Sequence, residues 1–571
     1  MFNYSNSFTK EKDMEFSKMT YCRPNLAKLE RSYARITQAF EQSRSAEEQY
    51  RLILEHEKLF CSFRTMASLA LIRSSININD KYYDGEMSFI NASEPVFTGY
   101  QLNFYRAVAA SPLRKGLEKY TGSLFFTNIG LSLKAFSPET VELQKRENAL
   151  ETEYEKLLAS AKISFRGKIL NLSELQKYSI SPDRSIRREA WQKTAGFFLS
   201  NSERLDSIYD ELVKNRTEQA HRLGYQDYVQ LGYDRLGRNC YGPGEVKKYR
   251  EQIVHDLVPK ITELKKRQAK RLGLPDIKFW DDGCLFPDGN PVPQGSTAEL
   301  VDDAQQMYHE MSPLTGEFFD YMKQNGLFDL ESKEGKEGGG YCDDIPDYKS
   351  PFIFSNFNGT AGDVEVLTHE AGHAFASYLA LRSIPLLEMS CPTMDAAETH
   401  SMSMELFARP WDKLFFGKSG AEKFHQYQLE SALDFIPYGC LVDHFQTEMY
   451  RHPEFTPEER KQVWLKLEHL YRPWIDFADM PFFNAGGGYQ RQHHIYSSPL
   501  YYIDYCLAQT TALEFGVASE KNWKEAFSRY LAFVKAGGTK TYIQLVESAG
   551  LELPFHEGCI SRLCAEIGSY L

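Results

Sequence analysis

The chain has 571 residues and a formal net charge of -12, with 42% hydrophobic and 25% charged side chains. Because this length exceeds what one simple core needs, we expect a multi-lobed globular molecule. The acidic balance argues against a surface that binds nucleic acid. No apolar run approaches the roughly 18 residues of a membrane span, so we expect no membrane partner.

Cysteine usage bears on the cellular compartment. The ten cysteines include no Cys-x-x-Cys pair, and the first residues contain no apolar core of signal-peptide length. Scattered cysteines of this kind predict reduced thiols and a cytoplasmic location. The oligomeric state does not follow from the sequence.

The first 160 residues have the pattern of long amphipathic helices. Leu26, Leu29, Tyr33, Ile36 and Phe40 form one apolar stripe at helical spacing. Residues 162–172 then alternate apolar and polar side chains about a glycine, which is typical of a β-hairpin. We therefore predict an N-terminal helical region over residues 1–160 and a second domain over residues 161–571.

A short aromatic strand that ends in an Asn-Gly turn is predicted at residues 350–359. If this strand lies at the edge of a sheet, an extended peptide can pair with it, and Phe354 and Asn356 become substrate-binding residues. A strand buried inside a small sheet is the equally supported alternative.

The helix that follows carries the strongest chemical signal, the motif His369-Glu370-Ala-Gly-His373. Two histidines four residues apart lie on one helix face and can hold a catalytic zinc, with Glu370 directed at a metal-bound water. The helix is predicted to run from about residue 360 to Ser383, since Pro385 prevents its continuation. A catalytic zinc needs about three protein ligands, so one more must come from elsewhere.

The third ligand is ambiguous from the residues alone. Spacing excludes a third His at the position of Leu379 and a Glu at the position of Pro392. Glu388, Glu398 and His400 remain as candidates. Glu398 lies early in a second helix, where it can face the histidine pair of an antiparallel neighbour. Glu405, on the same face as Glu398, can orient a ligand histidine by accepting its second ring proton.

A metal and a base do not complete a peptidase site, because the oxyanion also needs a hydrogen-bond donor. Residues 492–505 combine two histidines with four tyrosines next to a triple glycine, and these side chains can bind substrate or the oxyanion. An aromatic core helix is the alternative interpretation. The candidates are His493, His494, Tyr496, Tyr501, Tyr502 and Tyr505.

At this point the chain resembles the thimet oligopeptidase/oligoendopeptidase F family of zinc peptidases. The similarity lies in Leu-Thr-His369-Glu370-Ala-Gly-His373-Ala and in Ala-Ala-Glu398. It implies a mainly α, two-lobed metallopeptidase with a deep central channel, to which our own reading adds a small β-sheet beside the zinc helix. It also implies one Zn²⁺ per chain and cleavage of internal bonds in short, unstructured peptides.

The resemblance also implies roles for individual residues. It makes His369, His373 and Glu398 the zinc ligands and Glu370 the base that activates the zinc-bound water. Tyr505 matches the tyrosine that assists the transition state.

For the assisting histidine, His493 fits by spacing from Tyr505, whereas His494 fits the family's His-x-Tyr pattern with Tyr496. We favour His494. Two other functions stay open: a related helical zinc carboxypeptidase, and a catalytically inactive helical peptide-binding protein.

Overall fold

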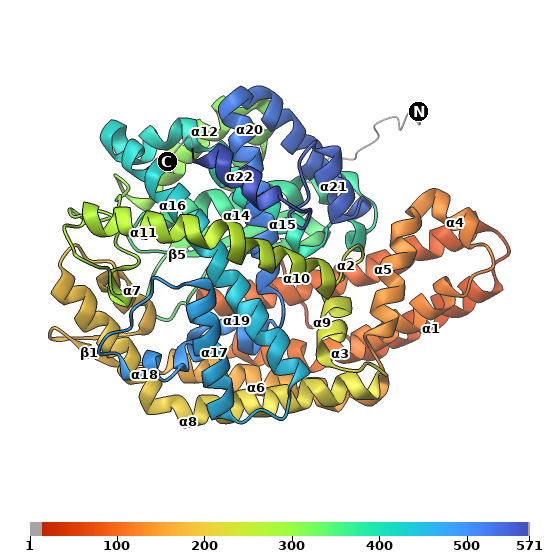
Figure 1. Cartoon of the computed structure of the whole chain (residues 1–571). Helices are drawn as coiled ribbons and strands as arrows, with labels where there is room; N and C mark the ends of the chain where they lie inside the picture. The colour runs from red at the N-terminus through yellow and green to blue at the C-terminus, as the bar shows by residue number, and fades with distance from the viewer. Residues whose placement is uncertain (1–13, 569–571) are drawn as a thin grey trace.

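The N-terminal helices form a lobe that projects from the rest of the molecule, red to orange in Figure 1. The computed structural model describes residues 14–568. The lobe has its own apolar core, in which the predicted stripe residues Tyr33, Ile36 and Phe40 are buried. Its helices are α1 (Leu26–Gln42), α2 (Ala46–Ile76), α3 (Lys81–Ala109), α4 (Arg114–Thr121) and α5 (Ser123–Lys134).

The second lobe is also built mainly of helices, which confirms the mainly α, two-lobed prediction. A single large apolar core runs through it. Its helices are α6 (Val141–Ala159), α7 (Leu172–Ser179), α8 (Arg184–Arg222), α9 (Tyr228–Arg235), α10 (Pro243–Gln252), α11 (Val258–Arg271), α12 (Thr297–Met311), α13 (Pro313–Gln324), α14 (Gly362–Ser383), α15 (Met394–Phe407), α16 (Asp412–Arg451), α17 (Pro457–Tyr471), α18 (Pro481–Asn484), α19 (His493–Ser497), α20 (Tyr502–Lys535), α21 (Tyr542–Ser548) and α22 (Cys559–Ile567). The predicted boundary at residue 160 falls between α6 and the first strand and stays a prediction.

The predicted hairpin is confirmed: β1 (Ile163–Phe165) pairs antiparallel with β2 (Lys168–Leu170). Arg166 and Gly167 join the strands with φ angles of 48° and 80°. Positive φ at both turn residues matches the twist of a two-residue hairpin.

A three-stranded sheet lies beside the central helices, in the order β3-β5-β4. β3 (Phe328–Glu331) pairs parallel with β5 (Ser350–Phe357), and β4 (Tyr341–Ile345) pairs antiparallel with it. Of the two alternatives for the aromatic strand, the structure shows the buried one, since β5 is the central strand and β4 is an edge. A run of residues buried on both faces, as in β5, is typical of a central strand.

The helix pair α14 and α15 lies near the middle of the molecule in Figure 1. α14 ends at Ser383, before Pro385, as predicted. The two helices pack tightly at Gly372, where an added Cβ would lie 2.6 Å from the Cα of Ser401 and 2.8 Å from the carbonyl oxygen of His400. Only glycine permits this contact, which sets the distance between the helices.

The N-terminal lobe contacts the connector between α14 and α15. His56 on α2 lies 3.3 Å from Glu388, and the carboxylate of Glu57 accepts a 2.8 Å hydrogen bond from the backbone amide of Leu387. Gln101 on α3 donates to Glu388 as well, at 3.0 Å. The connector that joins the two central helices is thus held by side chains of the other lobe.

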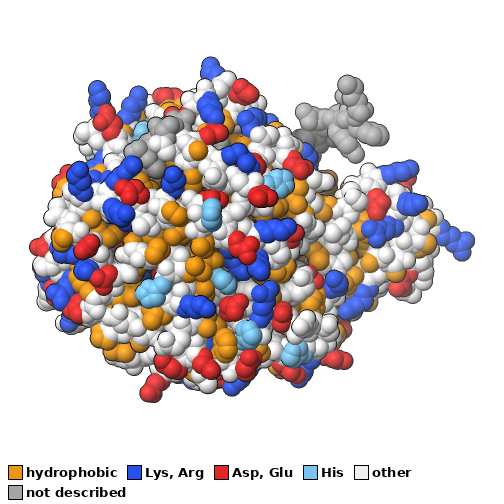
Figure 2. Space-filling model, viewed as in Figure 1, with side chains coloured by type: hydrophobic (Ala, Val, Ile, Leu, Met, Phe, Trp, Pro, Cys, Tyr) orange, Lys and Arg blue, Asp and Glu red, His pale blue; other side chains and the backbone are white. Residues whose placement is uncertain are grey.

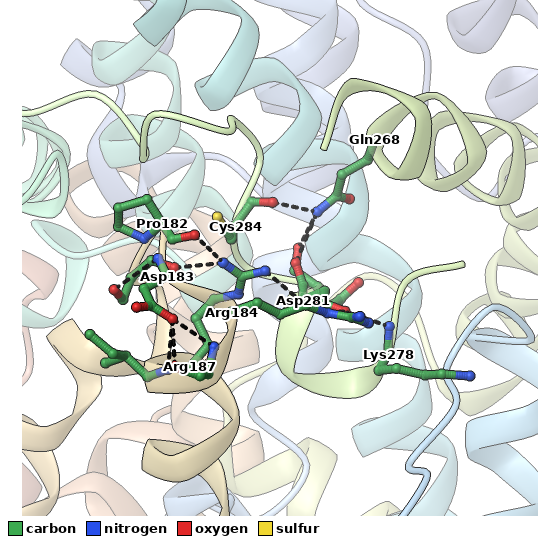
Figure 3. Close-up of polar contacts among 12 residues, drawn as sticks. Pro182, Asp183, Arg184, Arg187, Gln268, Lys278, Asp281 and Cys284 are labelled. Atoms are coloured by element: carbon green, nitrogen blue, oxygen red, sulfur yellow. Dashed lines mark hydrogen bonds and ion pairs between the residues drawn. The ribbon is translucent and has the colours of Figure 1, made fainter. Parts of the chain in front are cut away.

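The irregular segment 272–293 is held against the start of α8 by the polar network drawn in Figure 3. The buried carboxylate of Asp281 accepts hydrogen bonds from Arg184 at 2.7 Å and from Arg187 at 2.7 Å. The amide nitrogen of Gln268 donates to the carbonyl oxygens of Asp281 and Cys284. These groups satisfy one another, so the segment is fixed although it has little regular structure.

The surface seen in Figure 2 carries acidic and basic side chains interspersed with hydrophobic ones. Within residues 14–568, we find no helix of the length and apolarity required to cross a membrane. All ten cysteines are free thiols.

Candidate metal centre and active site

Three possible metal ligands converge between α14 and α15. The Nε2 atoms of His369 and His373 each lie 3.3 Å from Oε2 of Glu398, and the donor atoms of the three residues lie within 4.8 Å of one another. Burial opposes ionisation of Glu398, but the two histidines outweigh it and hold the pKa of this carboxyl well below its usual range. The group is therefore an anionic, two-nitrogen and one-oxygen donor set.

Two further side chains fix the orientation of these donors. Oε1 of Glu405 lies 2.7 Å from Nδ1 of His369, so the Nδ1 proton of this histidine is held and its Nε2 lone pair is left for a metal. The hydroxyl of Tyr501 donates to Oε1 of Glu398 at 2.5 Å, which leaves Oε2 facing the histidines. Each neighbour thus binds the atom of the side chain that does not face the metal position, Nδ1 of His369 or Oε1 of Glu398.

The rival third ligands lie elsewhere. Glu388 contacts His56 and Gln101 of the N-terminal lobe. His400 is buried with its ring against Phe533, at 5.6 Å between centroids. The structure brings Glu398 to the histidine pair and places neither rival there.

Glu370 lies between the two histidines in sequence and is buried, with a relative exposure of 7%. Burial raises its pKa, while the charges of His369 and His373 lower it. A carboxylate with a raised pKa beside a metal position has the properties of a general base.

His494 is held as a neutral hydrogen-bond donor. Tyr438 donates to the Gln492 carbonyl at 2.8 Å, which directs the Gln492 amide group to Nδ1 of His494 at 3.0 Å. Nδ1 is then the acceptor, so the ring proton is on Nε2. Burial, with repulsion from His493, lowers the pKa of His494 to about 4, so the ring is uncharged at neutral pH.

The tyrosines of α20 pack around this histidine. Ring centroids of Tyr501, Tyr502 and Tyr505 lie 5.9, 4.9 and 5.7 Å from that of His494. The pKa of both Tyr501 and Tyr505 is raised far above the usual range, mainly by burial and secondly by the charge of Glu398. Both hydroxyls therefore stay protonated and can donate hydrogen bonds.

Four predicted substrate-binding residues lie outside this group. Phe354 and Tyr496 are fully buried, Phe354 against Tyr341 and Tyr496 stacked 3.9 Å from Tyr154, so the prediction of substrate contact is wrong for both.

His493 faces away from the centre, 3.4 Å from Glu155 on α6. The Asn356 amide donates to the carbonyl oxygens of Glu337 and Gly339 and holds the glycine-rich segment that precedes β4. Both side chains are at least partly exposed, and substrate contact by either one stays a prediction.

Sequence reasoning missed three features of the site. Gln492 had no assigned role, although its amide sets the tautomer of His494. Gly372 was treated as part of a motif rather than as a point of helix contact. β4 was missed because its sequence, Tyr-Cys-Asp-Asp-Ile, lacks the alternation of a half-buried strand. The continuous apolar run Phe352-Ile353-Phe354 in β5 was the available signal for a central strand.

Two cavities border the aromatic cluster. A large cavity of about 930 Å³ is lined by Tyr501 and by Glu388, and extends to Tyr105 of the N-terminal lobe. A small cavity of about 450 Å³ is lined by Gln492 and by Phe435, which packs on Tyr505. Two concave spaces thus adjoin the residues that contact His494 and Tyr505.

Comparison with known proteins identifies the family of this chain. Residues 295–563 match the model of peptidase family M3, and residues 16–136 match the peptidase M3 N-terminal domain. The solved structure of PZ peptidase A with inhibitor 2 is similar with a TM-score of 0.95 and 44% identity, over 97% of this chain and 99% of that chain. This chain belongs to peptidase family M3. The membership confirms the predicted family, whose members are metallopeptidases, the class of enzyme that the sequence predicts.

Curated relatives of this M3 chain are more distant. Oligopeptidase PepF of Bacillus subtilis is 22% identical over 72% of this chain, and an oligoendopeptidase F homolog of Borreliella burgdorferi is 23% identical over 44% of it. The matches span 63% and 44% of the length of these two relatives.

Proposed function

We propose that this protein is a zinc-dependent oligoendopeptidase that hydrolyses internal bonds of short peptides. The observation that carries the proposal is the convergence of His369, His373 and Glu398 next to the buried carboxyl of Glu370. Membership of a peptidase family supports peptides as the substrate. The ten cysteines are free thiols, which supports a location in a reducing compartment. We propose that this compartment is the cytoplasm.

The donor set fits zinc. Two imidazole nitrogens and one carboxylate oxygen, with room for water or substrate, are the protein ligands of many catalytic zinc sites. His369 is oriented for this by Glu405, and Glu398 by Tyr501. When bound, zinc would supply a lowered pKa for an attacking water and polarisation of the scissile carbonyl.

Glu370 would accept the proton of the attacking water and pass it to the nitrogen of the leaving amine. Its burial favours the neutral form after the first transfer, and the two histidines favour the charged form before it. These opposing effects suit a group that must take up and release a proton in one reaction.

The oxyanion would receive hydrogen bonds from the Nε2 proton of His494 and the hydroxyl of Tyr505. Both donors are uncharged and fixed before the reaction, His494 by Gln492 and Tyr505 by its packing against Tyr501. Donors that need no reorganisation stabilise a developing charge most effectively.

The peptide backbone would lie along β4, the edge strand that follows the glycine-rich segment. Within residues 14–568, β4 pairs with β5 on one side only. β4 contacts α14, the helix of the two histidines, and the charges of Glu370 and His373 act on Cys342 and Asp344 of this strand. Pairing with an edge strand selects extended, unstructured peptides.

The test is the Glu370→Gln variant, assayed on a peptide blocked at both ends. Wild type with zinc should cleave it, whereas Glu370→Gln should lose roughly 10²–10⁴-fold in kcat with its zinc content retained. Glu365→Gln, one turn earlier on the same helix, is the matched control and should keep most of the activity. Wild-type rates in Glu370→Gln would exclude this mechanism, and failure of wild type to cleave blocked peptides would favour the carboxypeptidase alternative.

A further inference from the structure

Arg491 stands out among the charged groups of the small cavity. It ends the short helical turn Gly487–Arg491 and is half-buried. Its guanidinium lies over the rings of Trp191 at 4.6 Å and Phe483 at 5.4 Å. Across residues 14–568, it makes no hydrogen bond or ion pair with another side chain or with the backbone. A cation is thus held against two aromatic faces with its N–H edges directed to no protein acceptor.

The other cations around this cavity are neutralised. Lys265 contacts Asp282 at 2.8 Å and Asp434 at 2.9 Å. Arg472 contacts Asp282 at 2.9 Å and Glu468 at 3.3 Å.

The remaining polar groups are also satisfied. Arg271 binds both oxygens of Glu430, at 3.0 and 2.7 Å. Gln268, on the same wall, donates to backbone carbonyls in the network of Figure 3. Among the described residues, Arg491 is the cation of this cavity without a direct ion pair, although the charge of Glu468 acts on it.

An unpaired guanidinium in a half-buried cavity favours an anion. Burial lowers the pKa of Arg491, because a buried position disfavours its positive charge. Stacking on aromatic rings leaves the planar edge of the guanidinium free, and this edge matches the two oxygens of a carboxylate.

The position of the small cavity links this anion site to the proposed chemistry. Gln492, the next residue after Arg491, lines the cavity and binds His494. Phe435 lines it too and lies 6.2 Å from the ring of Tyr505. The small cavity therefore lies next to residues that contact His494 and Tyr505.

The small cavity is lined by four acidic and three basic side chains, Asp282, Glu430, Asp434 and Glu468 against Lys265, Arg472 and Arg491, and the large cavity is also acidic. The lining of the large cavity carries more acidic than basic side chains: Glu94, Glu147, Glu151, Asp234 and Glu388 against Arg235 and Lys540. In the small cavity each acidic side chain is paired with a cation, so the unpaired arginine is the group that favours the α-carboxylate of a peptide.

We propose that Arg491 binds the C-terminal carboxylate of the substrate, so that the small cavity holds the residues after the cleaved bond. The proposal rests on the proposed peptidase function and adds a determinant of substrate length. A carboxylate fixed at one end of the site sets how many residues lie between the cleaved bond and the C-terminus. Peptides of different length then share one cleavage position counted from that end.

The experiment compares one peptide in two forms, with a free C-terminal carboxylate and with a C-terminal amide. We expect wild type to cleave the acid with a kcat/KM roughly 10- to 100-fold above that of the amide, mostly through KM. In Arg491→Gln this ratio should fall close to one, and in Arg491→Lys to an intermediate value, since an ammonium cannot bind bidentately. Residual cleavage of the amide reports that each variant is folded.

Two controls complete the design. Arg188→Gln removes an arginine that lies one turn from Trp191 on α8 and pairs with Asp479, and it should leave the ratio unchanged. An amidated peptide with Glu as its last residue distinguishes a side-chain carboxylate from the terminal one, and it should behave like the amide. A peptide series extended at its N-terminus should keep one cleavage position counted from the C-terminus.

Several results would overturn the proposal. These are equal wild-type rates on acid and amide, an unchanged ratio in Arg491→Gln, and full rescue of the amide by a terminal Glu side chain. An equal fall on acid and amide in Arg491→Gln would assign the residue a structural role. Absence of cleavage of both forms by zinc-loaded wild type would instead refute the peptidase function.

Discussion

Gly372→Ala tests whether the contact of α14 with α15 sets the metal centre. The new Cβ would lie 2.6 Å from the Cα of Ser401, 2.8 Å from the carbonyl oxygen of His400 and 3.0 Å from the Cβ of Met404. Two of these atoms belong to the α15 backbone, so no side chain can swing away. Restoring an ordinary contact needs a helix displacement of about 0.8 Å, at an overpacking cost of about 1–3 kcal/mol.

The displacement reaches the metal position directly. Glu398 is one turn before Ser401 and is bonded to the Ser401 hydroxyl at 3.1 Å. Metal sites tolerate deviations of roughly 0.2 Å, so a shift of this size should lower zinc affinity about 10- to 100-fold. Chelator competition measures the affinity, and the thermal midpoint should fall by about 2–4 °C per kcal/mol.

Gly516→Ala is the matched control, because its Cβ would meet the flexible end of Leu406, at 3.0 Å, on the α20 side of the same helix. We expect a small loss of stability there and unchanged zinc affinity. Wild-type zinc affinity and thermal midpoint in Gly372→Ala would refute the idea that this contact positions Glu398.

Three further predictions follow from the polar contacts. Tyr505→Phe should lower kcat roughly 10²–10³-fold with little change in KM, measured by steady-state kinetics, and an effect confined to KM would exclude a role in the transition state. Gln492→Met should lower kcat with the fold retained, since Nδ1 of His494 loses its donor; an unchanged rate would show that the tautomer does not matter. Burial and the charge of Glu388 raise the pKa of Glu57 from 4.5 to about 8, so the folded chain binds more protons than the unfolded chain between these values. Stability should therefore fall as the pH rises through this window, and thermal midpoints of Glu57→Gln should vary less with pH than those of wild type; equal slopes would contradict the assignment.

Elements whose ends or turns are set by Pro or Gly were predictable from the sequence. The helix of the His-Glu-x-x-His motif has its predicted end because Pro385 cannot continue it, and the hairpin has its predicted turn at Gly167. Both depend on local backbone preferences, which a short stretch of sequence contains.

Contacts between distant segments were less predictable. Glu398 could be proposed but not distinguished from Glu388 by residue type, because the choice depends on how two helices meet at Gly372. The position of the aromatic strand in the sheet could not be decided because strand order is a property of pairing, and β4 contributes only five residues with no clear pattern. Tyr496 and Tyr501 have the same side chain, yet one is in the core and the other at the metal position.

The contact between Tyr501 and Glu398 has a consequence for how the protein is made. The two residues are separated by 103 positions in sequence, and His56 and Glu388 by 332. A chain emerging from the ribosome thus presents both histidines of the motif long before α20 can hold the third ligand in place. Because domains form as synthesis proceeds from the N-terminus, the first lobe can be ready to receive the connector when it appears. Tight metal loading should then be a late event that follows release of nearly the whole chain.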